Sequence, residues 1–266
     1  MSRSTRLRPR PLRALALLGL ALALSAGSVE GQGPLDGLRR GMQSQAAFTK
    51  GQALYDRHDY RGARDQFVMA VTLDPTHDEA MALLGWCQYF LGEYRAAGIT
   101  FKAALRRQPS WSGLHDGLGW SRLRLKRYHL ATEAFQDALD RDPDYSNALI
   151  GLGSAQFELG RYEEALSPLE KGLRRTTLFR AAGQELPEAR AKLAWTLYYL
   201  GRYDAALAAF GEALRAAPDG HGLYNGMGWT YLRLGRKMEA QAAFRRALAL
   251  QPDYEDAREG LRQASG

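Results

Sequence analysis

Residues that could carry catalysis or bind a metal are few in this chain and widely spaced. A metal site needs converging ligands, and no two histidines stand at i and i+4, where one helix face would present both. We expect the histidines at the surface or as helix caps, because they fall mostly at turns or helix starts: His58, His77, His115, His129 and His221. The sequence therefore predicts no metal site.

Short glycine strings are the second candidate for chemistry, because glycine-rich loops can cradle phosphates. Such a loop follows a strand, whereas Gly117–Gly119, Gly151–Gly153 and Gly226–Gly228 lie inside segments with helical patterns. We interpret them as glycines that let helices pack closely. Since no polar cluster converges, the sequence predicts that the protein has no catalytic residue, is not an enzyme and uses no cofactor.

The basic charge of the chain is concentrated at its start. Lys and Arg number 36 against 29 Asp and Glu, which gives a net charge of +7. Five of the arginines lie within residues 1–28, which contain no acid. The remainder is nearly balanced and offers little of the attraction that dominates binding to phosphate backbones. We therefore expect no nucleic-acid partner.

Residues 1–28 have the layout of a secretory signal peptide. The arginines precede an apolar run from Ala14 to Leu24, and small residues follow as far as Ser28. The apolar run is shorter than the roughly 20 residues that span a bilayer. We predict cleavage near Ser28 and export to the periplasm or another extracytoplasmic compartment. The alternative is an uncleaved signal that anchors the chain to the inner membrane, as its only membrane contact.

A period of 34 residues organises the rest of the chain. Within each period, a small, a large and a small residue follow at positions 20, 24 and 27, so the three side chains share one helix face. Proline then ends the second helix in five periods, and Thr177 stands there in the fourth. The residue at position 20 is always alanine: Ala63, Ala97, Ala131, Ala165, Ala206 and Ala240.

The first half of each period is also helical in pattern. A small residue stands at position eight, and the first helix ends at a glycine in four periods, with His58 and Lys126 in the other two. On these residues the chain resembles the tetratricopeptide repeat family, as an exported bacterial-type member, with its frame W-x2-L-G-x2-Y…A-x3-F…P. The tryptophan of position four is absent, and most periods carry one at position nine instead.

The resemblance implies an all-α fold, in which six antiparallel helix pairs stack into a right-handed α-solenoid and the first helices line a concave groove. Residues 1–28 are assigned to the signal peptide, 29–43 to a linker, 180–186 to an insertion and 255–266 to a C-terminal capping helix. Cys87 stands where the family has alanine, so we expect a buried, inert thiol. The six repeats within 44–254 are 44–77, 78–111, 112–145, 146–179, 187–220 and 221–254.

Aromatic residues form a stripe on the first helices. Positions 9 and 12 share a helix face, and in proteins of this family such positions commonly face the groove. Gln52 and Ser154 replace the tryptophan of position 9 in the first and fourth repeats, and Arg180 to Leu186 interrupt the period. The partner-binding candidates are Trp86, Tyr89, Phe90, Trp120, Arg124, Phe157, Trp195, Tyr198, Tyr199, Trp229 and Arg233. Groove charges are sparse and mixed in sign: Asp56, Glu79, Asp116, Arg124, Glu158, Glu188, Lys192 and Arg233.

Two interpretations of the stripe remain open. The aromatic side chains could pack on one another between adjacent first helices and only tighten the stack. Alternatively they bind a partner, because a large exposed apolar strip marks an interaction site and tryptophan and tyrosine dominate binding hot spots.

The leading functional hypothesis is an exported interaction scaffold or adaptor that binds another protein or a peptide segment through the aromatic groove. The alternative is a glycan-binding component of an envelope polysaccharide assembly or export pathway, in which sugar rings stack on the tryptophans.

Overall fold

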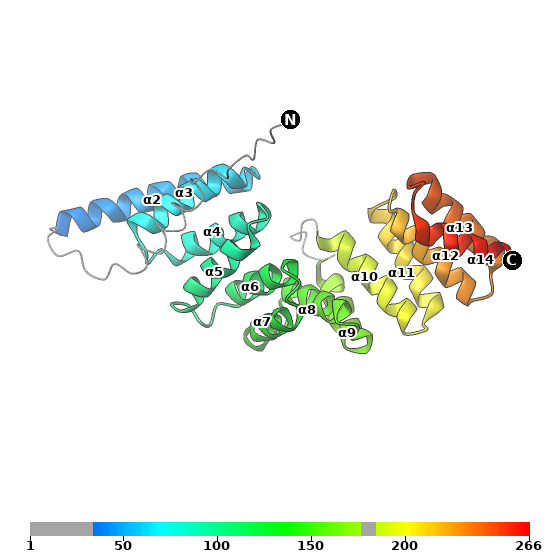
Figure 1. Cartoon of the computed structure of the whole chain (residues 1–266). Coiled ribbons are helices and arrows are strands. Elements are labelled where there is room, and N and C mark those ends of the chain that lie inside the picture. Colours follow the sequence, from blue (N-terminus) through cyan, green and yellow to red (C-terminus); the bar gives the residue numbers. More distant parts are fainter. Residues whose placement is uncertain (1–33, 177–184) are drawn as a thin grey trace, which may run out of the picture. The chain divides into compact units, whose positions relative to one another are not determined.

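The computed structural model describes residues 34–176 and 185–266, and these contain thirteen helices and no strand. The helices pair consecutively along the chain (Figure 1). The predicted all-α solenoid of helix hairpins is therefore confirmed. The signal peptide assigned to residues 1–28 and residues 180–184 of the predicted insertion lie outside the described residues. None of the described helices is long and apolar enough to cross a membrane.

The helices fall into two compact units, of which unit 1 ends at Pro109 and unit 2 begins at Ser110. In unit 1, α3 packs against both α2 and α4, and α4 pairs with α5. In unit 2, each first helix contacts its own second helix and also the first helix of the next repeat. The helices of unit 1 are α2 (Pro34–Asp56), α3 (Tyr60–Leu73), α4 (Asp78–Phe90) and α5 (Tyr94–Leu105). Those of unit 2 are α6 (Ser112–Arg124), α7 (Tyr128–Arg141), α8 (Ser146–Glu158), α9 (Tyr162–Thr176), α10 (Glu185–Tyr199), α11 (Tyr203–Ala216), α12 (His221–Arg233), α13 (Lys237–Leu250) and α14 (Glu255–Ser265).

Five of the six second helices place a fully buried phenylalanine ring against the first helices, and α9 has the buried Leu169 at that position. Phe135 on α7 is fully buried, and a Cβ on Gly119 of α6 would lie 2.6 Å from its ring. A Cβ on Gly151 of α8 would come still closer, at 2.3 Å. Only glycine leaves room for the ring on both sides, so these glycines set how closely α6, α7 and α8 pack.

The turn after each first helix uses a left-handed residue. Gly160 and Gly235 have φ values of 72° and 73°, which cost glycine nothing because it has no Cβ. His58 and Lys126 adopt the same conformation at φ 62° and 58°. The backbone at these two positions is therefore strained relative to the glycine turns.

The structure corrects three sequence assignments. Residues 34–43, assigned to a linker, are helical because α2 begins at Pro34, where a first-turn proline is tolerated. Glu185 and Leu186, assigned to the insertion, belong to the start of α10. His115, expected at the surface or as a cap, is buried within α6, and its Nδ1 lies 3.7 Å from Asp137 Oδ2 on α7.

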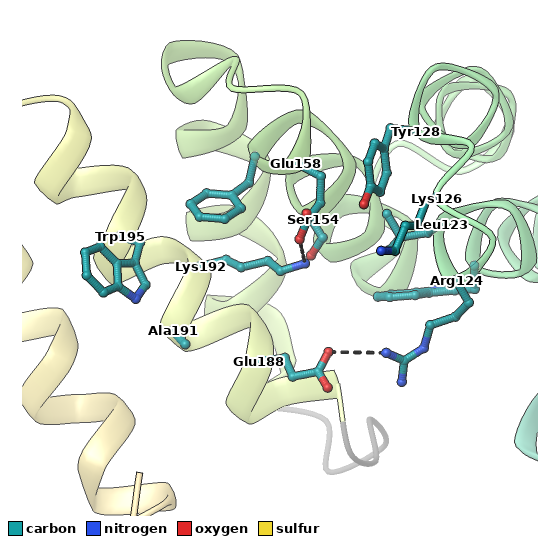
Figure 2. A pocket seen from close by; sticks show the side chains of 12 residues that line it. Leu123, Arg124, Lys126, Tyr128, Ser154, Glu158, Glu188, Ala191, Lys192 and Trp195 are labelled. Atoms are coloured by element: carbon teal, nitrogen blue, oxygen red, sulfur yellow. Dashed lines mark ion pairs between the residues drawn. The ribbon is translucent and has the colours of Figure 1, made fainter. Parts of the chain in front are cut away.

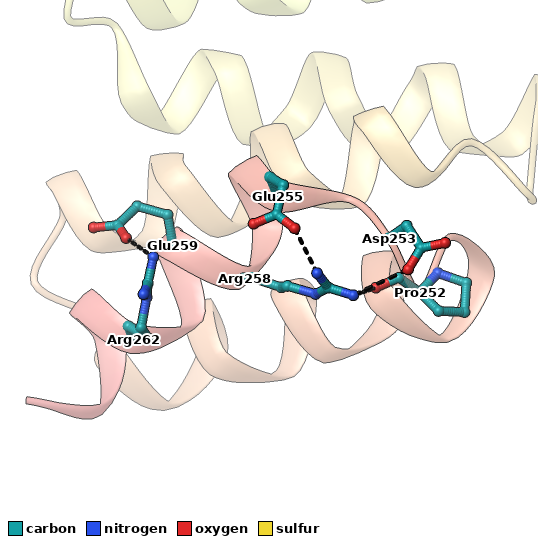
Figure 3. A network of polar contacts seen from close by, with 6 residues as sticks. All are labelled: Pro252, Asp253, Glu255, Arg258, Glu259 and Arg262. Atoms are coloured by element: carbon teal, nitrogen blue, oxygen red, sulfur yellow. Dashed lines mark hydrogen bonds and ion pairs between the residues drawn. The ribbon is translucent and has the colours of Figure 1, made fainter.

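The C-terminal helix α14 packs on α12 and α13. Its small residues Ala257, Gly260 and Ala264 are buried against them. Its exposed face carries ion pairs, with Arg258 reaching both Glu255 and Asp253 (Figure 3). The helix α14 thus has an apolar inner face and a charged outer face.

Candidate functional site

The four tryptophans of the stripe are part of the hairpin packing. Each lies edge-on against the phenylalanine of the second helix of its own repeat, with ring centres 5.3 to 5.4 Å apart. The pairs are Trp86 with Phe101, Trp120 with Phe135, Trp195 with Phe210 and Trp229 with Phe244. The ring contacts between adjacent first helices, which the packing interpretation expects, are made by Tyr55 with Phe90 and by Phe157 with Tyr199.

A cavity of about 510 Å³ lies in unit 2 where one tryptophan of the stripe is missing (Figure 2). Ser154 on α8 occupies position 9, between repeats that have Trp120 and Trp195 at that position, and all three residues line the cavity. The serine side chain is much smaller than an indole ring, and Ser154 itself is buried, at 3% exposure. The other lining residues are Leu123, Arg124, Lys126, Tyr128, Phe157, Glu158, Glu188, Ala191 and Lys192.

Two ion pairs between different first helices lie at this cavity, and Figure 2 shows both. Lys192 Nζ on α10 lies 2.8 Å from Glu158 Oε1 on α8. Arg124 on α6 lies 3.6 Å from Glu188 Oε2 on α10, so this pair joins two helices that are not consecutive in the stack.

The carboxylate of Glu158 has a second neighbour in the cavity. Burial, the charge of Glu158 and a hydrogen bond to it all raise the pKa of the Tyr128 phenol. The cavity therefore presents charges of both signs beside aromatic and aliphatic walls. Its volume lies within the range of ligand sites, about 300 to 1,000 Å³, and seven of its twelve lining residues have polar or charged side chains.

Comparison with known proteins decides the family. The family model described as tetratricopeptide repeat matches residues 48–110, 117–177 and 191–255, which is more than half of the chain. The chain belongs to the tetratricopeptide repeat family. Tetratricopeptide repeat stacks are protein–protein interaction scaffolds that bind proteins or peptides and are generally non-catalytic. No curated protein sequence matches this tetratricopeptide repeat protein.

Solved structures share its fold at low sequence identity. YrrB, described as a TPR protein with an unusual peptide-binding site, is 20% identical with a TM-score of 0.61, over 74% of this chain and 97% of YrrB. PilF of Pseudomonas aeruginosa is 19% identical with a TM-score of 0.68, over 85% of this chain and 99% of PilF. MamA is 21% identical with a TM-score of 0.55, over 66% of this chain and 92% of MamA.

The structure brings only some of the candidate residues of this tetratricopeptide repeat protein together. Trp120, Arg124, Phe157 and Trp195 line the cavity of unit 2. Trp86, Tyr89 and Phe90 lie on α4 of unit 1. The remaining candidates on α10 and α12 do not line the cavity: Tyr198, Tyr199, Trp229 and Arg233.

The two candidates on α12 are engaged in contacts of their own. Trp229 Nε1 donates a hydrogen bond to Asp256 Oδ2 on α14, at 3.1 Å. Arg233 Nε donates to the Tyr198 hydroxyl at 3.3 Å, and this bond raises the pKa of Arg233. Both residues connect neighbouring helices, which gives them a structural role whether or not a ligand reaches them.

Each unit also contains a cluster of six aromatic rings with the same geometry. In unit 1, Tyr60 stacks on Phe90 at 4.6 Å, and in unit 2 Tyr162 stacks on Tyr199 at 4.4 Å. Phe90 and Tyr199 are the most exposed rings of their clusters, at 42% and 51%. The members in unit 1 are Tyr55, Tyr60, Trp86, Tyr89, Phe90 and Tyr94. Those in unit 2 are Phe157, Tyr162, Trp195, Tyr198, Tyr199 and Tyr203.

The same duplication can be read in the sequence when each repeat is compared with the third repeat after it rather than with the next one. Repeats 1 to 3 align with repeats 4 to 6, so position 9 shows a polar residue followed by two tryptophans in each half. Position 13 shows an acid, an aromatic residue and an arginine in each half, namely Asp56, Phe90 and Arg124, then Glu158, Tyr199 and Arg233. A repeat unit of three hairpins therefore underlies the aromatic clusters.

Sequence reasoning missed the polar members of the cavity. Glu158, Glu188 and Lys192 were counted as scattered groove charges, and Ser154 only as a gap in the stripe. The single serine between tryptophans at position 9 is the signal that could have located the cavity.

Proposed function

We propose that this tetratricopeptide repeat protein is an exported adaptor that binds a segment of a partner protein in the cavity of unit 2. The observation that carries the proposal is a cavity of about 510 Å³ lined by Trp120, Ser154 and Trp195, where the middle repeat has serine in place of tryptophan. A bulky apolar side chain placed there would be enclosed by aromatic surface, the usual environment of a binding hot spot.

The polar groups of the cavity also suit a peptide. Lys192 and Arg124 can donate hydrogen bonds to main-chain carbonyls, and Glu158 and Glu188 can accept them from main-chain N–H groups. The lining carries three cations and two carboxylates, so the site favours a segment with one large apolar residue flanked by polar ones over a uniformly acidic or basic segment. YrrB, which shares the fold, is described as having a peptide-binding site, and that makes a peptide ligand a natural use of the scaffold.

Site-specific cross-linking tests this proposal. A photoreactive benzoylphenylalanine replaces Glu188, which lines the cavity, and in a matched control it replaces Gly211 on α11, which has open space around it. We expect a partner protein to be cross-linked from position 188 only, and a synthetic peptide of the cross-linked segment to compete. Equal cross-linking from both positions, or no competition by the peptide, would contradict binding in the cavity.

Export is supported by residues 1–28, in which arginines precede an apolar run and small residues. The full chain, expressed in a bacterial host, should lose these residues and appear in the extracytoplasmic fraction. The mass of the purified protein measures the cleavage. Full-length protein in the membrane fraction would support the anchored alternative, and full-length protein in the cytoplasm would contradict both.

Glycan binding is the alternative function. Its support is the exposure of Phe90 and Tyr199, since sugars stack on aromatic faces. Tyr199 already stacks on Tyr162 and lies nearly parallel to Trp195, 5.9 Å away, which leaves less free ring face than an isolated surface ring would offer. Quenching of tryptophan fluorescence by an oligosaccharide panel would favour this alternative over the peptide.

A further inference from the structure

In unit 2, a lysine occupies a site made of an aromatic ring and an adjacent acid. Lys192 Nζ lies 5.9 Å from the centre of the Phe157 ring and 2.8 Å from Glu158 Oε1. The ammonium group therefore has a π face and a carboxylate as partners at once, and both attract a cation.

Unit 1 has an aromatic residue and an acid at the corresponding positions but no lysine. Tyr55 and Asp56 stand 102 residues before Phe157 and Glu158, at the same positions of their repeats. The residue that corresponds to Lys192 is Leu83, 109 residues earlier, because the insertion adds seven residues. Leucine carries no charge, so this position supplies no cation to the ring and acid of unit 1.

Matching ring contacts show that the local geometry is shared. The ring centres of Tyr55 and Phe90 are 6.2 Å apart, and those of Phe157 and Tyr199 are 6.3 Å apart. Tyr55 also contacts Tyr60 at 5.5 Å, as Phe157 contacts Tyr162 at 5.6 Å. The rings at the C-terminal end of α2 thus contact those of α4 as the rings of α8 contact those of α10.

The first helices of unit 1 carry the exposed acids Asp56 and Glu79, and the exposed Arg57 follows Asp56 in the chain. Asp56 is exposed, and no residue in the described part of the chain forms an ion pair with it. Glu79, on the same face of α4 as Trp86 and Phe90, is a second exposed acid. Arg64, a nearby cation, is held by Asp65 and Glu93 at 2.9 and 2.8 Å. An exposed aromatic cluster flanked by such acids is complementary to a positive ligand.

We propose that unit 1 binds the side-chain ammonium of a lysine in a partner protein, with Tyr55 and Asp56 in the roles that Phe157 and Glu158 perform for Lys192. This inference goes beyond the adaptor cavity, because it adds a second recognition site in the other unit with a defined ligand chemistry. The partner would present a lysine to unit 1 and an apolar residue to unit 2.

A titration of the whole chain with defined peptides tests the site. The probe is a capped Gly-Gly-Lys-Gly-Gly peptide, followed by the ring signals of Tyr55 and Phe90 in nuclear magnetic resonance spectra. We expect millimolar concentrations of this peptide to shift both signals, and the same peptide with Nε-acetyllysine or norleucine to leave them unchanged. Equal shifts with norleucine, or shifts that spare Tyr55 and Phe90, would overturn the proposal.

Variants of unit 1 give a second, independent readout. Asp56→Asn should weaken binding of the lysine peptide by about tenfold, since a charge-assisted contact is lost. Leu83→Lys should abolish it, because the introduced lysine fills the site as Lys192 does in unit 2, while Leu83→Met should bind as the native chain does. The site would be refuted if Asp56→Asn or Leu83→Lys bound the lysine peptide as tightly as the native chain does. Melting curves show whether each variant is folded.

Failure here is distinguishable from failure of the adaptor cavity. Ser154→Trp fills the cavity of unit 2 and should leave the lysine titration of unit 1 unchanged. A lysine titration that Ser154→Trp abolishes would place the ammonium in unit 2 and contradict the inference.

Discussion

Lys192 on α10 pairs with Glu158 on α8 at 2.8 Å, and this ion pair ties two consecutive first helices together beside the cavity. Both side chains are partly shielded from water, with 19% and 33% of their surface exposed. The pair therefore fixes the width of the cavity more firmly than a fully exposed pair would.

Breaking this pair should have a small, measurable effect on stability. Lys192→Met keeps the length of the side chain and removes the charge, and we expect the free energy of unfolding to fall by about 1 kcal/mol. The effect should largely vanish in a Glu158→Gln background, where no pair exists. Urea unfolding of the four combinations measures the coupling, and additive effects of the two substitutions would show that the pair contributes nothing.

The packing of Phe135 predicts opposite effects of two glycine substitutions. Gly151→Ala places a Cβ 2.3 Å from the Phe135 ring, and overpacking of this kind lowers stability by about 1 to 3 kcal/mol. Gly211→Ala meets nothing within 4 Å on the helix α11, so it should raise stability by about 0.5 to 1 kcal/mol through helix propensity. Thermal unfolding checks both, and stabilisation by both would contradict the proposed role of Gly151.

The left-handed turns predict that two opposite substitutions change the stability of the chain in opposite directions. Lys126 has φ 58°, so Lys126→Gly should stabilise the chain by about 1 kcal/mol, because glycine has no Cβ to clash in this conformation. Gly160→Lys, at φ 72°, should destabilise it by a similar amount. Changes of the same sign in chemical unfolding would show that the backbone at these turns carries no strain.

The Asp78 carboxylate predicts that the stability of unit 1 depends on pH. Burial opposes ionisation, but hydrogen bonds from Gln108 and Arg107 outweigh it and hold the pKa of Asp78 below its ordinary value of 3.8. A depressed pKa means that the carboxylate stabilises the fold above pH 3.8, and that this contribution is lost as the pH falls through the lower folded value. The contribution is small, below about 1 kcal/mol, because the pair is near the surface.

Amide exchange in α4 measures this effect. At neutral pH, the amide protons of α4 should exchange faster in Asp78→Asn than in the native chain. This difference in exchange rate should shrink at acid pH, as Asp78 becomes protonated in the native chain. A difference that stays constant down to acid pH would mean that the carboxylate charge is not responsible.

The hairpin fold was predictable because its determinants repeat. Alanine, phenylalanine and proline recur at fixed positions, and a recurring small–large–small spacing specifies one buried helix face each time. The extension of α2 back to Pro34 was not predicted, because residues 34–43 lack the repeat pattern even though Pro34 and Asp36 suit a first helical turn.

The cavity was only partly predictable. Trp120, Phe157 and Trp195 were selected because helical spacing shows which residues share a face. Spacing along one helix does not give the register between helices, so the pairing of Lys192 with Glu158 required the structure. The contacts of the tryptophans with the second helices were missed for the same reason.

The central claim is that the cavity lined by Ser154 receives a side chain of a partner, and its most direct test is an affinity measurement. The peptide identified by cross-linking would be labelled, and its binding to the native chain, Ser154→Ala and Ser154→Trp measured by fluorescence anisotropy. Tryptophan is compatible with this position, since four other repeats carry it. We predict near-native affinity for Ser154→Ala and a loss of at least about tenfold for Ser154→Trp, equivalent to about 1.4 kcal/mol. Native affinity in a correctly folded Ser154→Trp chain would contradict the account.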